Sequence, residues 1–85
     1  QPQKMLMLSE GLNVFRMSLN TKMEKKSMID LQIREDTGCS VVAIKKKENL
    51  MVNPDPTILL EKGDELVLIG TADAEKLYIE KYPVA

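Results

Sequence analysis

Two apolar runs constrain the fold of this chain more than any other feature. They read SVVAI and ELVLI, and in neither run do the apolar residues alternate with polar ones. Short runs rich in Val, Ile and Leu are typical of β-strands that are buried on both faces. Successive side chains of a strand point to opposite faces of the sheet. In the first run, Val41 and Ala43 are therefore expected on one face of the sheet, and Val42 and Ile44 on the other.

Apolar side chains on both faces of a sheet need cover on both faces. The chain has 85 residues, and the segments outside its strands provide for two short helices, which suffice for one face only. A second copy of the same domain would cover the other face. The strand pattern therefore predicts a homodimer.

Turn and capping residues divide the chain into six elements in the order β, α, β, β, β, α. The predicted strands are residues 12–19, 39–44, 50–52 and 66–70, and the predicted helices are residues 28–37 and 72–82. Strands that follow one another through short turns usually pair in antiparallel fashion. The expected fold class is α+β: a small domain with a three- to four-stranded, mostly antiparallel sheet and two helices.

The helix boundaries depend on residues with strong capping preferences. Ser27 and Thr71 precede the two helical segments, and a hydroxyl at this position accepts a hydrogen bond from the first turn of the helix. Asp30 lies three residues after Ser27 and completes an approximate capping box. Gly38 is expected to end the first helix in a left-handed conformation, and Pro83 to end the second.

The first eleven residues, QPQKMLMLSEG, differ in character from the rest of the chain. The sequence begins with Gln and this stretch resembles a connector, so residues 1–11 are expected to be a linker from a preceding domain. Residues 12–85 are expected to form the folded domain.

Composition excludes several classes of function. The chain has 12 basic and 13 acidic residues and a net charge of −1, which argues against a nucleic-acid partner that needs a strong positive field. It has one Cys and no His, so the usual zinc patterns and an internal disulfide are out of reach, and a reducing, cytosolic setting is expected. No apolar run approaches the ~20 residues that a membrane-spanning helix needs.

The single cysteine, Cys39, opens the first apolar run. A nucleophilic thiol needs a base that removes its proton, and the usual partner, histidine, is absent. We therefore expect Cys39 to be a buried and chemically inert hydrophobic residue.

Two groups of charged residues are further candidates for sites. The carboxylates of Asp30, Glu35 and Asp36 lie close in sequence, and clustered carboxylates suit a hard cation such as calcium. Their spacing does not match an EF-hand loop, however, and solvated helix residues are the alternative. The three lysines at residues 45–47, together with Arg34, suit either an anionic ligand or a charged strand edge that prevents unwanted strand pairing.

Several of these motifs occur together, in the same order, in one known family. They are the short helix with Leu31, the pair Ile33-Arg34, Gly38 before SVVAI, the NPDP loop, and the turn and strand GDELVLIG. In this combination the chain resembles the C-terminal domain of the regulator of potassium conductance (RCK) family, also called the TrkA C-terminal domain. The resemblance covers residues 12–82.

The resemblance implies a dimeric α+β domain that follows a Rossmann nucleotide-binding domain in the cytoplasmic gating apparatus of a membrane-associated potassium channel or uptake transporter. Some members of the family bind cyclic di-AMP in a cleft between two copies of this domain. Carried over by motif, the ligand-binding positions are Ile33, Arg34, Ser40, Val41 and Pro54.

The function implied by the resemblance is non-catalytic, and no set of residues in the sequence assembles an acid, a base and a nucleophile. The domain would bind a ligand, form a dimer, and couple ligand binding to the gating of ion transport. The alternative is a purely structural dimerisation domain of a cation or anion transporter with no ligand of its own.

Overall fold

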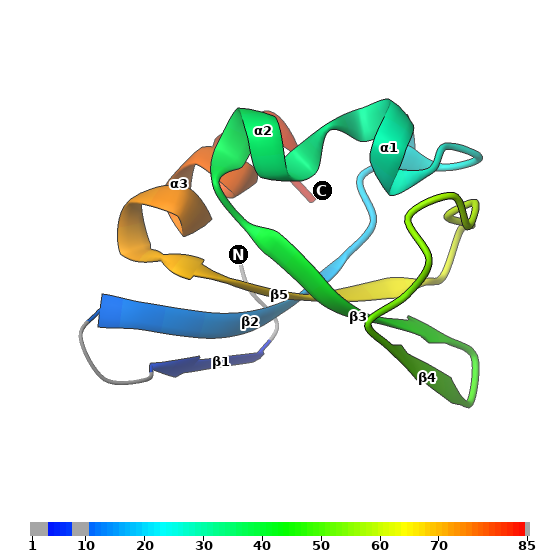
Figure 1. The fold of residues 1–85 in the computed structure, drawn as a ribbon, viewed down its shortest axis with the longest axis horizontal. Helices are drawn as coiled ribbons and strands as arrows, with labels where there is room; N and C mark the ends of the chain where they lie inside the picture. Colours follow the sequence, from blue (N-terminus) through cyan, green and yellow to red (C-terminus); the bar gives the residue numbers. More distant parts are fainter. Residues whose placement is uncertain (1–3, 8–10, 85) are drawn as a thin grey trace.

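The computed structural model describes residues 4–7 and 11–84 of the chain, and Figure 1 shows their arrangement. The strands are β1 (Lys4–Met7), β2 (Leu12–Ser18), β3 (Ser40–Lys46), β4 (Asn49–Val52) and β5 (Glu65–Thr71). The helices are the 3-10 turn η2 (Thr21–Met23), α1 (Met28–Leu31), α2 (Ile33–Thr37) and α3 (Ala72–Lys81). The predicted α+β class is confirmed.

All strands belong to one antiparallel sheet with the order β1-β2-β5-β3-β4. The sheet has five strands instead of the three or four expected, because Lys4–Met7 adds a strand that pairs with residues 13–16 of β2. Part of the segment that we expected to be a connector therefore belongs to the sheet. The rest of that segment, residues 1–3 and 8–10, lies outside the described residues.

The three α-helices lie on the same face of the sheet (Figure 1). Buried side chains from the helices and the strands together form the core. Tyr78 of α3 packs edge-on against Phe15 of β2, with 6.0 Å between ring centroids, and both side chains are fully buried. The core is completed by apolar residues from every layer: Met17, Met23, Ile33, Cys39, Ile44, Leu60, Leu66, Leu68, Ala74 and Tyr82. This packing fixes the helices above the sheet.

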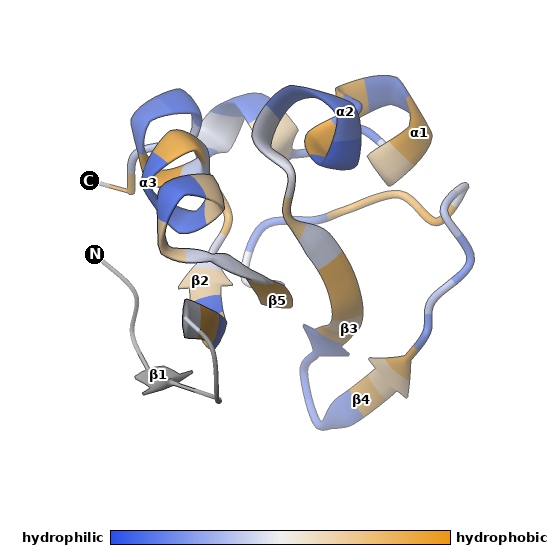
Figure 2. Ribbon diagram, turned by 60° about the vertical axis from the view of Figure 1, so that its left-hand side comes forward, coloured by the Kyte–Doolittle hydropathy of each residue, from blue (hydrophilic) through white to orange (hydrophobic). Residues whose placement is uncertain are grey.

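The alternation expected along the first apolar run is wrong, because β3 contains a β-bulge at Val42. Val41 pairs with Leu68, whereas Ala43 pairs with Val67, so the register shifts between these two positions. A bulge inserts one extra residue into a strand and changes the face to which the following side chains point. Val41 therefore faces the helices, and the apolar stretch of β3 runs beneath α2 (Figure 2).

The opposite face of the sheet is also apolar. Val67 and Ile69 are half-buried on that face, and Val67 pairs with Ala43 of β3. Leu50 and Val52 of β4 point to the same face and are 59% and 72% exposed. The sequence pattern thus correctly predicted a sheet with apolar residues on both faces.

The single helix expected at residues 28–37 is divided in two. Gln32 has a left-handed backbone (φ 54°, ψ 43°) and separates α1 from α2. Its amide still donates to the carbonyl of Met28 (3.0 Å), and its carbonyl still accepts from the amide of Asp36 (3.0 Å). One residue therefore ends the first helix and begins the second.

The reason for the break lies in the apolar residues on either side. At about 100° per residue, a continuous helix would place Met28 and Leu31 nearly opposite Ile33 and Thr37. In the structure, Ile33 and Thr37 are buried, and Met28 and Leu31 pack against the same core. The change of direction at residue 32 brings both halves onto the sheet, and this gain outweighs the cost of a left-handed residue.

Candidate ligand-binding pocket

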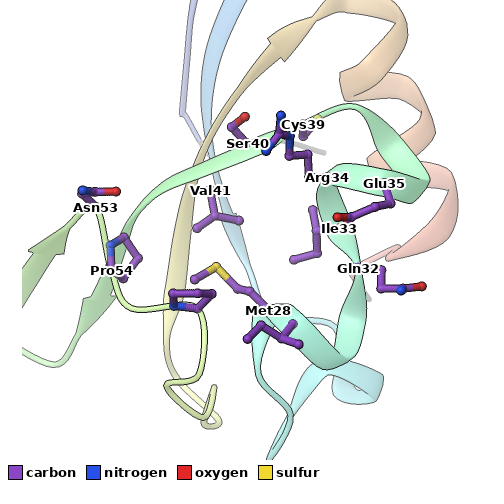
Figure 3. Close-up of a pocket in the computed structure, with 12 residues that line it drawn as sticks. Met28, Gln32, Ile33, Arg34, Glu35, Cys39, Ser40, Val41, Asn53 and Pro54 are labelled. Atoms are coloured by element: carbon purple, nitrogen blue, oxygen red, sulfur yellow. The ribbon is translucent and has the colours of Figure 1, made fainter.

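A pocket of about 480 Å³ lies between α1, α2, the beginning of β3 and the loop at residues 53–56 (Figure 3). Its wall consists of Met28, Ile29, Gln32, Ile33, Arg34, Glu35, Cys39, Ser40, Val41, Asn53, Pro54 and Pro56. All five residues that the family resemblance selected are among them. They come from three separate elements, and the fold brings them to one cavity.

The lower part of the pocket is apolar. Pro54 faces Ile33 across the cavity with Val41 between them (Figure 3). Ile33 is 2% exposed and belongs to the core, so its side chain is a fixed part of this surface. Ile29 is 56% exposed and forms an apolar edge of the pocket. A flat, apolar ring fits such a surface, because its contacts with aliphatic side chains exclude water.

The rim of the pocket is polar and charged. Arg34, Glu35, Ser40 and Asn53 are all exposed. In the view of Figure 3, Arg34 and Ser40 lie at one end of the pocket, and Met28 lies at the other. No ion pair among residues 4–7 and 11–84 uses Arg34. Its guanidinium, which presents donors in a planar fork, is therefore available to an anion.

The turn between α2 and β3 is fixed by short-range hydrogen bonds. Gly38 is left-handed (φ 83°), and its amide donates to the carbonyl of Arg34 (2.9 Å). The hydroxyl of Thr37 donates to the carbonyl of Ile33 (2.7 Å) and accepts from the amide of Cys39 (3.1 Å). These bonds set the position of Arg34 relative to the strand. The predicted left-handed glycine at the end of the helix is confirmed.

The loop at residues 53–56 is held at both ends. The amide of Asn53 donates to the carbonyl of Val42 (2.8 Å), and the carbonyl of Pro56 accepts from the amide of Ile29 (3.2 Å). The carboxylate of Asp55 accepts from the amide and the hydroxyl of Thr57 (2.9 and 2.7 Å). These two hydrogen bonds keep the pKa of Asp55 below its usual value. The proline loop is thus a defined wall of the pocket.

Cys39 borders the pocket, but its side chain is fully buried. Burial raises the pKa of its thiol, and the nearby Glu75 acts in the same direction, against the hydrogen bond with Thr37. A raised pKa keeps the thiol protonated and unreactive. The expectation that Cys39 is a buried hydrophobic residue is confirmed.

The three clustered carboxylates have three separate roles. Asp30 caps α1 reciprocally with Ser27, Asp36 pairs with Lys81 of α3, and Glu35 lies at the pocket rim. In the described part of the chain, no group of three acidic, Cys or His side chains is arranged to hold a metal ion.

The expected set of three lysines with Arg34 does not form one site. Lys46 is turned away from the pocket and bonds with Asp64 (2.5 Å) and Glu61 (3.3 Å). Burial lowers the pKa of Lys46, but its bonds with Asp64 and Glu61 outweigh this effect and raise the pKa. Lys46 is therefore a structural residue.

Sequence reasoning missed several residues of the pocket wall, among them Met28, Gln32, Glu35 and Asn53. Glu35 and Gln32 adjoin the Ile33-Arg34 pair, so inspection of its neighbours was the available signal. The left-handed backbone of Gln32 had no sequence signal, because glutamine is a good helix former.

Residues 14–81 match the model of the TrkA-C domain family. The ammonium/H⁺ antiporter subunit AmhM of Alkalihalophilus pseudofirmus is 38% identical over 55 residues, which are 65% of this chain and 33% of AmhM. The crystal structure of the GsuK RCK domain has a TM-score of 0.78 and 37% identity over 87% of this chain and 17% of that one. The RCK C domain of the potassium transport protein KtrA, in complex with cyclic di-AMP, has a TM-score of 0.72 and 34% identity over 79% of this chain and 80% of that domain.

The chain spans between about a fifth and a third of the length of the curated relatives that it matches. Among the described residues, no helix combines the length and the apolar character needed to cross a bilayer. The family model covers most of the chain, from β2 to the end of α3, and the solved RCK domains share its fold. The chain belongs to the TrkA-C domain family, the C-terminal domain of the RCK regulators.

Proposed function

We propose that this domain is a non-catalytic regulatory module that binds cyclic di-AMP between two copies of itself. The observation that carries the proposal is that Ile33, Arg34, Ser40, Val41 and Pro54 line one pocket with an apolar floor and a polar rim. This rim presents the guanidinium of Arg34, which is unpaired among the described residues. The similar KtrA domain was solved in complex with this ligand.

The chemistry of the pocket suits one half of a two-fold symmetric dinucleotide. Cyclic di-AMP has two adenine rings and two phosphates related by symmetry, so each copy would bind one of each. Arg34 would form a bidentate pair with a phosphate, and Ile33 and Val41 would pack against an adenine ring. The hydroxyl of Ser40 would donate one further hydrogen bond.

A second copy would also cover apolar surface that the single domain leaves exposed. Ile29 at the pocket edge and Pro54 opposite would be removed from water when two pockets face each other. A two-fold dimer presents the same patch from both partners, so each pocket would meet its own copy. This arrangement makes the ligand part of the dimer interface.

Coupling to transport follows from differential affinity. A ligand shifts an equilibrium between two dimer arrangements only if it binds one of them more tightly. We infer that the parent protein regulates potassium transport through a channel or uptake system, as the cytoplasmic part of a membrane-associated complex with a Rossmann domain. AmhM, which is also similar, is a subunit of an ammonium/H⁺ antiporter. Ammonium is therefore the alternative to potassium as the ion that the parent protein transports.

Calorimetric titration with cyclic di-AMP, combined with sedimentation with and without the ligand, tests the proposal. We expect binding of one ligand per two chains, and loss of at least about tenfold in affinity in Arg34→Ala, since a charged hydrogen bond is lost. Lys45→Ala is the matched control, because it removes a nearby positive charge that does not line the pocket.

Two results would contradict the proposal. The first is an absence of binding at high micromolar ligand. The second is a dimer that is stable without ligand, together with equal affinities of Arg34→Ala and Lys45→Ala for cyclic di-AMP. The second result would favour the purely structural dimerisation domain.

A further inference from the structure

Outside glycine, the described residues with a left-handed backbone are Lys25, Gln32, Lys47 and Asn53. Lys47 lies in the turn between β3 and β4, where such a conformation is common. The other three lie at the ends of two segments that form one side of the pocket. Lys25 and Gln32 lie on either side of α1, and Asn53 is the first residue of the proline loop.

These two segments are joined to each other. The amide of Ile29 in α1 donates to the carbonyl of Pro56 (3.2 Å), and both residues line the pocket. We call residues 27–31 and 54–58 together the flap. Its base is fixed, because the amide of Lys25 donates to the carbonyl of the fully buried Leu60 (2.6 Å), and the amide of Leu60 donates to the carbonyl of Lys26 (2.8 Å).

Few contacts hold the flap against the rest of the domain. Ser27 is buried, but none of the residues of α1 is, and Met28 and Leu31 are only partly buried against the core. The hydroxyl of Tyr82 donates to the carbonyl of Leu31 at a long 3.3 Å. Segments with few buried apolar contacts are those that open most readily in native proteins.

A right-handed backbone at Gln32 would move the flap. If its backbone became right-handed, α1 and α2 would join into one helix over residues 28–37. The bond from the amide of Gln32 to Met28 fits both states, since it has the spacing of a regular helix. The joined helix would turn Met28 and Leu31 away from the core and would break the bond between Ile29 and Pro56.

We propose that the flap opens and closes the pocket, with Gln32 and Asn53 as its hinges. This inference rests on the proposed ligand-binding function and specifies how access to that site is controlled. Hinges are a few residues at the ends of elements that absorb a large change in φ and ψ. Both hinge residues line the pocket, so a bound ligand would contact the parts that must move.

Hydrogen exchange of the unliganded chain tests the flap directly, because the amide of Ile29 is protected only while the flap is closed. Gln32→Gly should slow this exchange by about tenfold or more, since glycine accepts the left-handed conformation and disfavours the joined helix. Lys47→Gly is the matched control. Its φ of 54° is the same as that of Gln32, but it lies outside the flap and should leave Ile29 unchanged.

Asn53→Gly provides a second, independent variant at the other hinge and should also slow the exchange of Ile29. The proposal is overturned if Gln32→Gly and Lys47→Gly have the same effect on Ile29. It is also overturned if Ile29 exchanges at the rate of the central β5 amide of Leu68, because the flap would then open only on global unfolding. The readout needs no ligand, so it is independent of the calorimetric test of the proposed function.

Discussion

Lys46 connects β3 to the segment that follows the proline loop, and its removal should be unusually costly. Its amine donates to the carboxylates of Asp64 (2.5 Å) and Glu61 (3.3 Å) and to the carbonyl of Leu59 (3.1 Å). The side chain of Asp64 is only 7% exposed, and the same oxygen that meets Lys46 also accepts from the amide of Glu61 (2.9 Å). Lys46→Ala would leave this buried carboxylate without its cation.

The magnitude follows from burial. Removing one partner of a fully buried ion pair costs about 3–5 kcal/mol, whereas an exposed pair contributes about 0–1 kcal/mol. Asp64 is buried, but the side chain of Lys46 is 21% exposed, so water screens the pair in part. We therefore expect Lys46→Ala to lower the free energy of unfolding by about 2–3 kcal/mol, or the Tm by about 10–20 °C for a domain of this size.

Urea unfolding followed by circular dichroism measures this loss, and Lys45→Ala is the control, because Lys45 has no partner among the ion pairs of the described residues. A double-mutant cycle with Asp64→Asn should give a coupling energy above about 1 kcal/mol. If the free energies of unfolding of Lys46→Ala and Lys45→Ala differ by less than about 0.5 kcal/mol, the reasoning from burial is refuted.

Three further predictions follow from the core. A Cβ at Gly70 would lie 3.1 Å from the sulfur of Cys39 and 3.2 Å from Ala74, so Gly70→Ala should destabilise the domain by about 1–3 kcal/mol in urea unfolding, and an added Cys39→Ala should restore part of the loss. Burial raises the pKa of Tyr78, so the folded state holds the phenol proton more tightly than the unfolded state does. The free energy of unfolding should therefore fall as the pH rises above about 10. An equally steep fall in Tyr78→Phe would contradict this prediction. The carboxylate of the buried Glu75 accepts a hydrogen bond from the side-chain amide nitrogen of Asn13 (2.8 Å). The side-chain oxygen of Asn13 has no partner among the described residues. Glu75→Gln should therefore change stability by less than about 1 kcal/mol, whereas Asn13→Asp should cost about 3 kcal/mol, and similar losses for the two variants would contradict this account.

Local signals made the boundaries of most elements predictable. Ser27 and Thr71 both accept hydrogen bonds from the first turns of their helices, and Gly38 is left-handed, because these effects act over three or four residues. The β-bulge at Val42 and the break at Gln32 had no local signal. Each places apolar side chains against a core whose shape is set by distant segments, so the register of β3 and the path of α1 depend on the whole fold.

The pocket shows the same division. The sequence supplied a motif with an arginine, a serine and a proline, and the resemblance to a family turned these residues into a candidate site. Only the tertiary structure decided that Ile33, Ser40 and Pro54 share one cavity, because they belong to a helix, a strand and a loop.

The sequence by itself determined the order of the main strands and helices, the caps and a sheet that is apolar on both faces, since these depend on side-chain period and short-range hydrogen bonds. The tertiary structure alone decided the pairing of Lys4–Met7 with β2, the direction of α1 and the ion pairs of Lys46. These features depend on contacts between residues far apart in the chain, and a linear pattern does not contain the distances on which such contacts depend.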